Sequence, residues 1–215
     1  MSMLHLLAAL MPKGAAARTL TFIDSAVSSG ASITIPAAAL ENDIAFLADA
    51  SQLGTDNVLP SGFTSLANAT SEGDLRLRTS YRVLGSSPGG TSVTGMSGAF
   101  TDNKVMLIFR PSVVASSVAV PTWGSEATQS NPASQSVLAA GQVAPLVVIG
   151  VSATSGGSPA FSVETPAFTA KVTQGLVQVG YTIYNDTPLD HTIDMADLGN
   201  RNVFQTGYIR AVFPT

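Results

Sequence analysis

A two-residue alternation of apolar and polar side chains restricts the fold more than any other feature of this sequence. It is clearest in residues 75–83. One set of alternate positions holds Leu75, Leu77, Thr79, Tyr81 and Val83, and the other holds Arg76, Arg78, Ser80 and Arg82. Successive side chains of a β-strand point to opposite faces, so this pattern predicts a half-buried antiparallel strand.

Similar patterns recur along the chain and predict further short strands. They cover residues 19–24, 32–36, 43–48, 62–67, 105–110, 116–123, 144–151, 167–172, 177–184 and 205–213. Clusters of Gly, Pro, Asn, Asp and Ser separate many of them, as at residues 86–90, 101–103, 155–159 and 185–188. Short strands at turn-marked intervals predict an all-β fold, an antiparallel β-sandwich of jelly-roll-like type.

Length and composition indicate one main domain. The chain has 215 residues, of which 45% are hydrophobic, so it can fill a sizeable core. We expect residues 18–215 to form a single β-sandwich domain that follows an N-terminal arm or anchor at residues 1–17. No internal sequence repeat of fixed period is evident. Charged residues make up only 11%, roughly half the usual share, which predicts an exterior rich in hydroxyl groups.

The charge pattern argues against several functional classes. The formal net charge is -4, and the Lys and Arg residues are scattered, so the sequence offers no basic stripe for nucleic acid. There is no cysteine, which excludes disulfides, thiolate catalysis and Cys-based metal sites. We expect neither a cofactor nor a nucleic-acid partner.

One segment formally matches a catalytic motif. Residues 85–89 (GSSPG) fit the Gly-x-Ser-x-Gly pattern of hydrolases, which requires a strand, a strained turn and then a helix. The residues that follow predict another strand or a loop, and only His5 and His191 are available as a base. We therefore expect a hairpin turn here, no catalytic residue, and a protein that is not an enzyme.

The richest polar cluster lies at residues 186–197 and contains four carboxylates and one imidazole. The candidate ligand or ion-binding residues are Asp186, Asp190, His191 and Asp194. Oxygen ligands of this kind suit calcium. The segment lacks the regular pattern of a calcium loop, however, and Asx-turns with a helix N-cap at Asp194 account for the same residues. We favour the turn and cap interpretation and expect no metal.

The single tryptophan and the segment after it form a second candidate. Trp123 ends an apolar strand, and its ring would serve either as an edge or interface anchor or as a platform for a sugar. Residues 124–140 are rich in Ser, Ala, Gln and Asn and almost uncharged. They predict a long surface loop that is a candidate for contact with a neighbouring subunit.

The N-terminal segment is strongly apolar. The candidate partner-binding residues there are Leu4, Leu6, Leu7, Leu10 and Met11, which have helical spacing and a broad apolar face. The run is too short for a membrane span, and Lys13 and Arg18 follow it, whereas the positive charge of a secretory signal precedes its apolar stretch. It is either a helix packed on its own domain or an arm that docks on another subunit.

Several segments taken together resemble a family of small structural proteins of tailed bacteriophages and related prophages. They are residues 32–36 (SITIP), 41–47 (ENDIAFL), 60–65 (PSGFTS), 77–84 (LRTSYRVL), 93–96 (VTGM), 104–111 (KVMLIFRP) and 191–199 (HTIDMADLG). The likeness extends over most of the chain beyond residue 30. It implies a virion location, and the other virion proteins of the tail or capsid as partners. It supplies no catalytic residue.

Two functions are consistent with these features. The first is a homo-oligomeric accessory subunit on the exterior of the tail or capsid, of fibre, spike or decoration type, which binds copies of itself and is anchored by its N-terminal segment. The alternative is a module that binds host surface glycans through hydroxyl-rich loops and an aromatic ring such as Trp123 or Tyr184.

Overall fold

The computed structural model describes residues 17–52, 58–71, 75–94, 96, 101–121, 123–128, 134–196 and 201–214. These residues form sixteen strands, paired in antiparallel sheets, and contain no helix, so the all-β prediction is confirmed. None of the described residues belongs to a helix that could cross a bilayer. The predicted arm or helix lies outside the described residues except for Ala17.

The first half of the chain forms one large sheet and one small sheet. The large sheet has the order β1 (Leu20–Ser28), β7 (Thr101–Pro111), β3 (Ile44–Gln52), β5 (Arg76–Val83) and β4 (Thr64–Thr70). The small sheet pairs β2 (Ile33–Thr34) with β6 (Ser92–Val93).

The second half has a corresponding pair of sheets. Its large sheet has the order β13 (Ala170–Gln174), β14 (Val177–Tyr184), β11 (Leu146–Thr154) and β16 (Asn202–Val212). The outer edge of β16 pairs with both β8 (Ser117–Ala119) and β9 (Gly124–Thr128). The small sheet has the order β10 (Gln135–Val137), β15 (His191–Met195) and β12 (Phe161–Thr165).

The two halves repeat one pairing scheme. In the first half β3 lies between β7 and β5, and in the second half β11 lies between β16 and β14. The edge strands β1 and β4 correspond to β9 and β13, and the pair β2–β6 corresponds to β10–β15. Pairing order depends on chain path and alternation rather than on residue identity, so it can repeat where the sequence does not.

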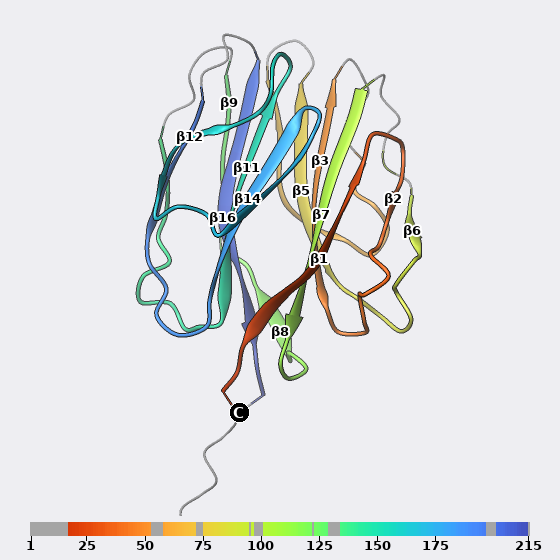
Figure 1. Cartoon of the computed structure of the whole chain (residues 1–215), viewed down its shortest axis with the longest axis vertical. Coiled ribbons are helices and arrows are strands. Elements are labelled where there is room, and N and C mark those ends of the chain that lie inside the picture. Colours follow the sequence, from red (N-terminus) through yellow and green to blue (C-terminus); the bar gives the residue numbers. More distant parts are fainter. Residues whose placement is uncertain are drawn as a thin grey trace, which may run out of the picture.

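The four sheets stack in layers, with the large sheets face to face in the middle (Figure 1). A central core fills the space between them, and a separate core lies beneath each small sheet. Strands β3 and β11 are therefore covered on both faces, and every residue of β11 is buried. Strand β5 keeps the predicted alternation only over residues 76–79, where Leu77 and Thr79 are fully buried and the two arginines are partly buried; beyond them Ser80 is buried and Val83 is 43% exposed, opposite to the prediction.

The predictions for two polar segments, one expected to be a turn and one a loop, are wrong. Residues 101–103 begin β7 rather than form a turn, because they pair with β3 and Asp102 is buried beside Lys104. Residues 124–140 are not one long loop, because β9 pairs with β16 and β10 pairs with β15. In both segments the polar residues that suggested a turn or loop are tied into a sheet by partners distant in sequence.

Candidate functional site at the basal end

The described chain begins and ends at the same end of the molecule, which we call the basal end. Ser112 N donates a 2.8 Å hydrogen bond to Thr19 O, and Arg18 Nη2 donates to Pro214 O. The Arg18 guanidinium also lies 5.6 Å from the centre of the Phe213 ring. Figure 1 shows this end at the bottom, next to the label of the C-terminus. Residues 1–16, with all five apolar candidates between Leu4 and Met11, lie outside the described residues and join the domain here.

Exposed apolar side chains surround this point. Leu40 and Val114 are 55% and 57% exposed and line, with Val113, a small pocket of about 180 Å³. Val143 is 68% exposed and lines a second pocket of about 180 Å³ with Arg18 and Phe213. The basal end therefore presents apolar surface where the N-terminal segment is attached.

An ion pair between a partly exposed arginine and a buried carboxylate holds the loop that carries Leu40. Arg110 donates from Nε and Nη2 to the two carboxylate oxygens of Asp43, each at 2.8 Å, and Asp43 is almost completely buried. Arg110 Nη2 also donates to Ala38 O, and Asp43 Oδ2 accepts from Leu40 N at 2.8 Å. The hydrogen bond to Asp43 raises the pKa of Arg110. Leu40 is thus exposed on a fixed loop.

A side-chain amide joins the two halves of the molecule at the basal end. Asn185 Oδ1 accepts a 2.7 Å hydrogen bond from Leu20 N, and Asn185 Nδ2 donates to Leu20 O at 3.1 Å. The side-chain amide reproduces the two hydrogen bonds that a neighbouring strand would make. The start of β1 is therefore tied to the loop that follows β14.

The structure places Trp123 in the central core, 7% exposed. Its ring stacks on Phe46 from the other large sheet, with centroids 5.7 Å apart. A Cβ atom on Gly207 would lie 2.6 Å from the indole, so this glycine is required for the close approach. Trp123 is an anchor between the two halves, and its ring face is not presented to the exterior.

Two carboxylates of the acidic segment accept backbone hydrogen bonds, one from within the segment and one from a residue distant in sequence. Asp186 Oδ1 accepts from Thr187 N and Asp190 Oδ1 accepts from Ala140 N, each at 2.7 Å. Asp194 lies inside β15 opposite Val163, so the predicted helix cap at Asp194 is wrong. Among the described residues no group of three His, Cys, Asp or Glu side chains could hold a metal ion. Asp197 lies outside them.

His191 is almost completely buried and packed among aromatic rings. Its Nε2 lies 2.8 Å from the Tyr184 hydroxyl, and its ring stacks on Phe168 at 5.9 Å between centroids. Burial lowers the pKa of His191, and the Pro166 backbone and the Asp190 carboxylate oppose this effect. The Tyr184 hydroxyl is thus hydrogen-bonded to His191, and the Tyr184 side chain is partly buried.

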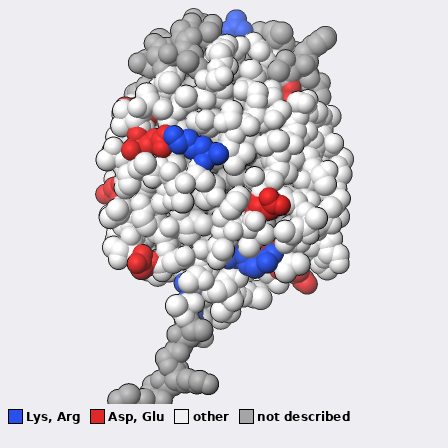
Figure 2. Space-filling view, in the orientation of Figure 1, with Lys and Arg blue, Asp and Glu red and all other residues white. Residues whose placement is uncertain are grey.

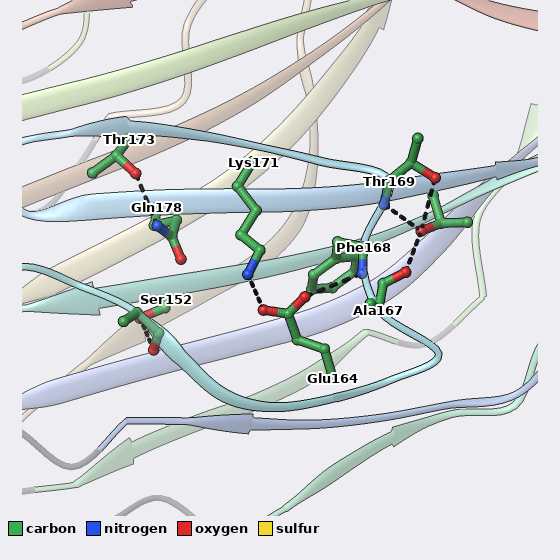
Figure 3. A network of polar contacts seen from close by, with 10 residues as sticks. Ser152, Glu164, Ala167, Phe168, Thr169, Lys171, Thr173 and Gln178 are labelled. Carbon is green, nitrogen blue, oxygen red and sulfur yellow. Dashed lines mark hydrogen bonds and ion pairs between the residues drawn. The ribbon is translucent and has the colours of Figure 1, made fainter.

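A polar network holds the loop beside His191, and Figure 3 shows it from close by. Glu164 forms an ion pair with Lys171 and accepts a 3.1 Å hydrogen bond from Phe168 N. Thr169 N donates to Thr182 Oγ1 at 3.0 Å. These contacts hold the Phe168 ring against His191. The residues around His191 are therefore closely packed and form no open site.

The Gly-x-Ser-x-Gly segment at residues 85–89 forms bends and a turn that lead into the short strand β6. Gly90 N donates a 2.9 Å hydrogen bond to Ile35 O, which ties this turn to the segment after β2. A nucleophile elbow leads into a helix, so the local geometry here differs from that of a hydrolase. The chain matches no protein-family model, no curated protein and no solved structure.

Proposed function

We propose that this protein is a homo-oligomeric structural subunit of a tailed-bacteriophage particle. It would be an accessory component on the exterior of the tail or capsid, of fibre, spike or decoration type, attached through its N-terminal segment. The observation that carries the proposal is the basal end, where the apolar N-terminal segment joins the domain amid exposed Leu40, Val113, Val114 and Val143.

We also infer that each half is a jelly-roll-like sandwich. In the first half the order β1-β7-β3-β5 packs on β2–β6, and in the second half β9-β16-β11-β14 packs on β10-β15-β12. Jelly rolls of this kind occur in viral capsid and lectin domains. That association is consistent with the structural role and with the glycan alternative, although fold by itself does not determine function.

The surface is consistent with assembly through neutral contacts. Of the described residues on the face shown in Figure 2, few are charged. A sparsely charged surface gives up little charge hydration when copies associate. Contacts of this type depend on shape and apolar area rather than on ion pairs.

The proposed occupant of the basal end is the N-terminal segment of a neighbouring copy. Leu4, Leu7 and Met11 belong to a segment so apolar that it requires protein cover in water. The exposed side chains of the basal end supply a matching apolar surface. Exchange of these segments between copies would link the subunits.

Light scattering on the full chain tests this proposal. The full chain is expected to oligomerise, whereas deletion of residues 1–13 and Val113→Asp should both give folded monomers with unchanged circular dichroism. Val27→Asp is the matched control, because Val27 is 48% exposed near the opposite end of β1. A monomeric full chain, or a truncated chain that unfolds, would contradict the assembly role.

Immunogold labelling of purified phage particles from the source strain tests the virion location. Regular labelling of the tail or head exterior supports the proposal, and particles that contain none of this protein refute it.

The second candidate function, recognition of a host glycan, is favoured by an uncharged pocket beside β10.

A further inference from the structure

The edge of the second large sheet is interrupted beside β16. Strand β9 pairs with residues 202–206 of β16 and β8 pairs with residues 210–212, but no described strand pairs with residues 207–209 on this side. The connecting segment leaves the edge at Pro121, which has no backbone N–H, and Trp123 turns into the core. The interruption leaves an opening at the side of the sheet.

A pocket of about 370 Å³ occupies this opening. Thr206 and Tyr208 of β16 form one side, and Ser136 and Leu138 in and after β10 form another. Gln142, in the turn before β11, completes the rim. This volume lies toward the lower end of the range for small-molecule sites, and suits a mono- or disaccharide unit better than a protein segment.

The residues that line the pocket are all uncharged. Ser136 supplies an exposed hydroxyl group, Gln142 supplies an exposed amide, and Leu138 is 70% exposed; Thr206 and Tyr208 also line the pocket, although both residues are largely buried. A charged ligand would find no counter-ion among these side chains, and desolvating an unpaired charge is costly. Hydroxyls and an amide next to apolar carbon instead match a neutral sugar, which has both hydroxyl groups and C–H faces.

The inner side of the pocket is fixed by close packing. Thr206 Oγ1 donates a 3.4 Å hydrogen bond to Gln135 Oε1. A Cβ atom on Gly124 would lie 2.2 Å from the same oxygen, so a larger residue there would displace the end of the Gln135 side chain. Thr206 is itself 1% exposed, so its side of the pocket is preformed, which lowers the entropy cost of binding.

We propose that this pocket binds a neutral saccharide. The inference rests on the second candidate function, glycan recognition, and gives it a location and a chemical class. It replaces the ring of Trp123 as the binding surface, because that ring is buried.

Saturation-transfer-difference NMR on the full chain tests the inference with glucose, galactose, mannose, rhamnose and N-acetylglucosamine as probes. An array of neutral and acidic bacterial oligosaccharides then identifies the best ligand for calorimetry. Ser136→Ala and Gln142→Ala should each weaken binding about tenfold, because each removes one hydrogen-bonding group from an exposed position. Tyr208→Phe removes only the hydroxyl and should also weaken binding.

Ser61→Ala is the matched control, because Ser61 is an exposed hydroxyl in a different pocket, beside Arg82. Binding that survives this control and falls in the pocket variants supports the inference. Failure to bind any neutral sugar, preference for acidic sugars, or equal binding by all variants overturns it. Light scattering on the same samples separates the proposals: oligomers that do not bind sugar refute only the pocket, and monomers that bind sugar refute only the assembly role.

Discussion

The indole ring of Trp123 stacks on the phenyl ring of Phe46, with the ring planes 17° apart. Phe46 belongs to β3 of the first large sheet, and Trp123 precedes β9 at the edge of the second. The contact therefore joins the two halves across the central core. Loss of this contact should therefore destabilise the whole molecule rather than one half.

Trp123→Ala is expected to lower the free energy of unfolding by about 3–5 kcal/mol, because it removes a large buried ring and leaves a cavity. Urea denaturation followed by circular dichroism measures this. Val27→Ala, at an exposed position away from the basal end, should change the value by less than about 0.5 kcal/mol. Equal effects of the two substitutions would show that the Trp123 contact does not stabilise the fold.

Gly180→Ala should destabilise the second half by about 1–3 kcal/mol, because the new Cβ atom would lie 2.3 Å from the buried Phe168 ring. Gly85→Ala is the control, since a Cβ atom at Gly85 meets nothing within 4 Å. Thermal unfolding compares the two variants. Phe168→Leu in the Gly180→Ala background should recover part of the loss, and a further loss instead would argue against a clash with the ring.

Lys104→Met should lower the free energy of unfolding by about 3–5 kcal/mol. Lys104 is fully buried, and its removal leaves two buried carboxylates together without a counter-charge. Lys104 Nζ lies 3.0 Å from Asp102 Oδ2 and 3.3 Å from Asp49 Oδ1, and it donates to Gly30 O at 2.8 Å. Chemical denaturation at pH 7 provides the measurement. Asp49→Asn should cost less than Lys104→Met, because it leaves Lys104 paired with Asp102. The reverse order would contradict this account.

Asp49 should make stability depend on pH in the acidic range. Burial raises its pKa from 3.8 to about 6, against the opposing effect of Lys104. The folded state therefore holds this proton between about pH 4 and pH 6 while the unfolded chain releases it. The resulting contribution to stability is present at low pH and is lost as the pH rises through 6, on the order of 3 kcal/mol.

Asp49→Asn removes this contribution, so the variant should gain stability relative to the native protein as the pH rises from 4 to 7. Melting temperatures of both proteins at four pH values in this range test the prediction. His191 titrates in both proteins and cancels in the difference. A constant difference across the range would show that Asp49 does not titrate as described.

His191 should act in the opposite direction. Burial lowers its pKa below the ordinary value of 6.5, so the unfolded chain takes up a proton at a higher pH than the folded state does. The native protein is therefore expected to lose stability, relative to His191→Gln, as the pH falls below about 6.5. Glutamine cannot titrate in this range and retains a polar group toward Tyr184. Parallel melting curves for the two proteins would refute this expectation.

The sequence by itself determined the all-β class and the alternation over the first half of β5, because a strand with one face on the central core places apolar side chains at every second position. It also predicted strands near residues 44–48 and 146–151. Short apolar runs bounded by turn-forming residues are typical of buried strands. These predictions succeeded where burial follows from local pattern.

Only the tertiary structure decided the rest. Asp102 is typical of a turn in sequence, yet it lies in β7 because Lys104 and β3 pair with it. The burial of Trp123 depends on Phe46 and Gly207, which are distant in sequence. The pocket beside β10 exists because two short strands share the edge of β16 and leave a gap between them. Each of these features requires partners brought together by the fold, and no local pattern records such partners.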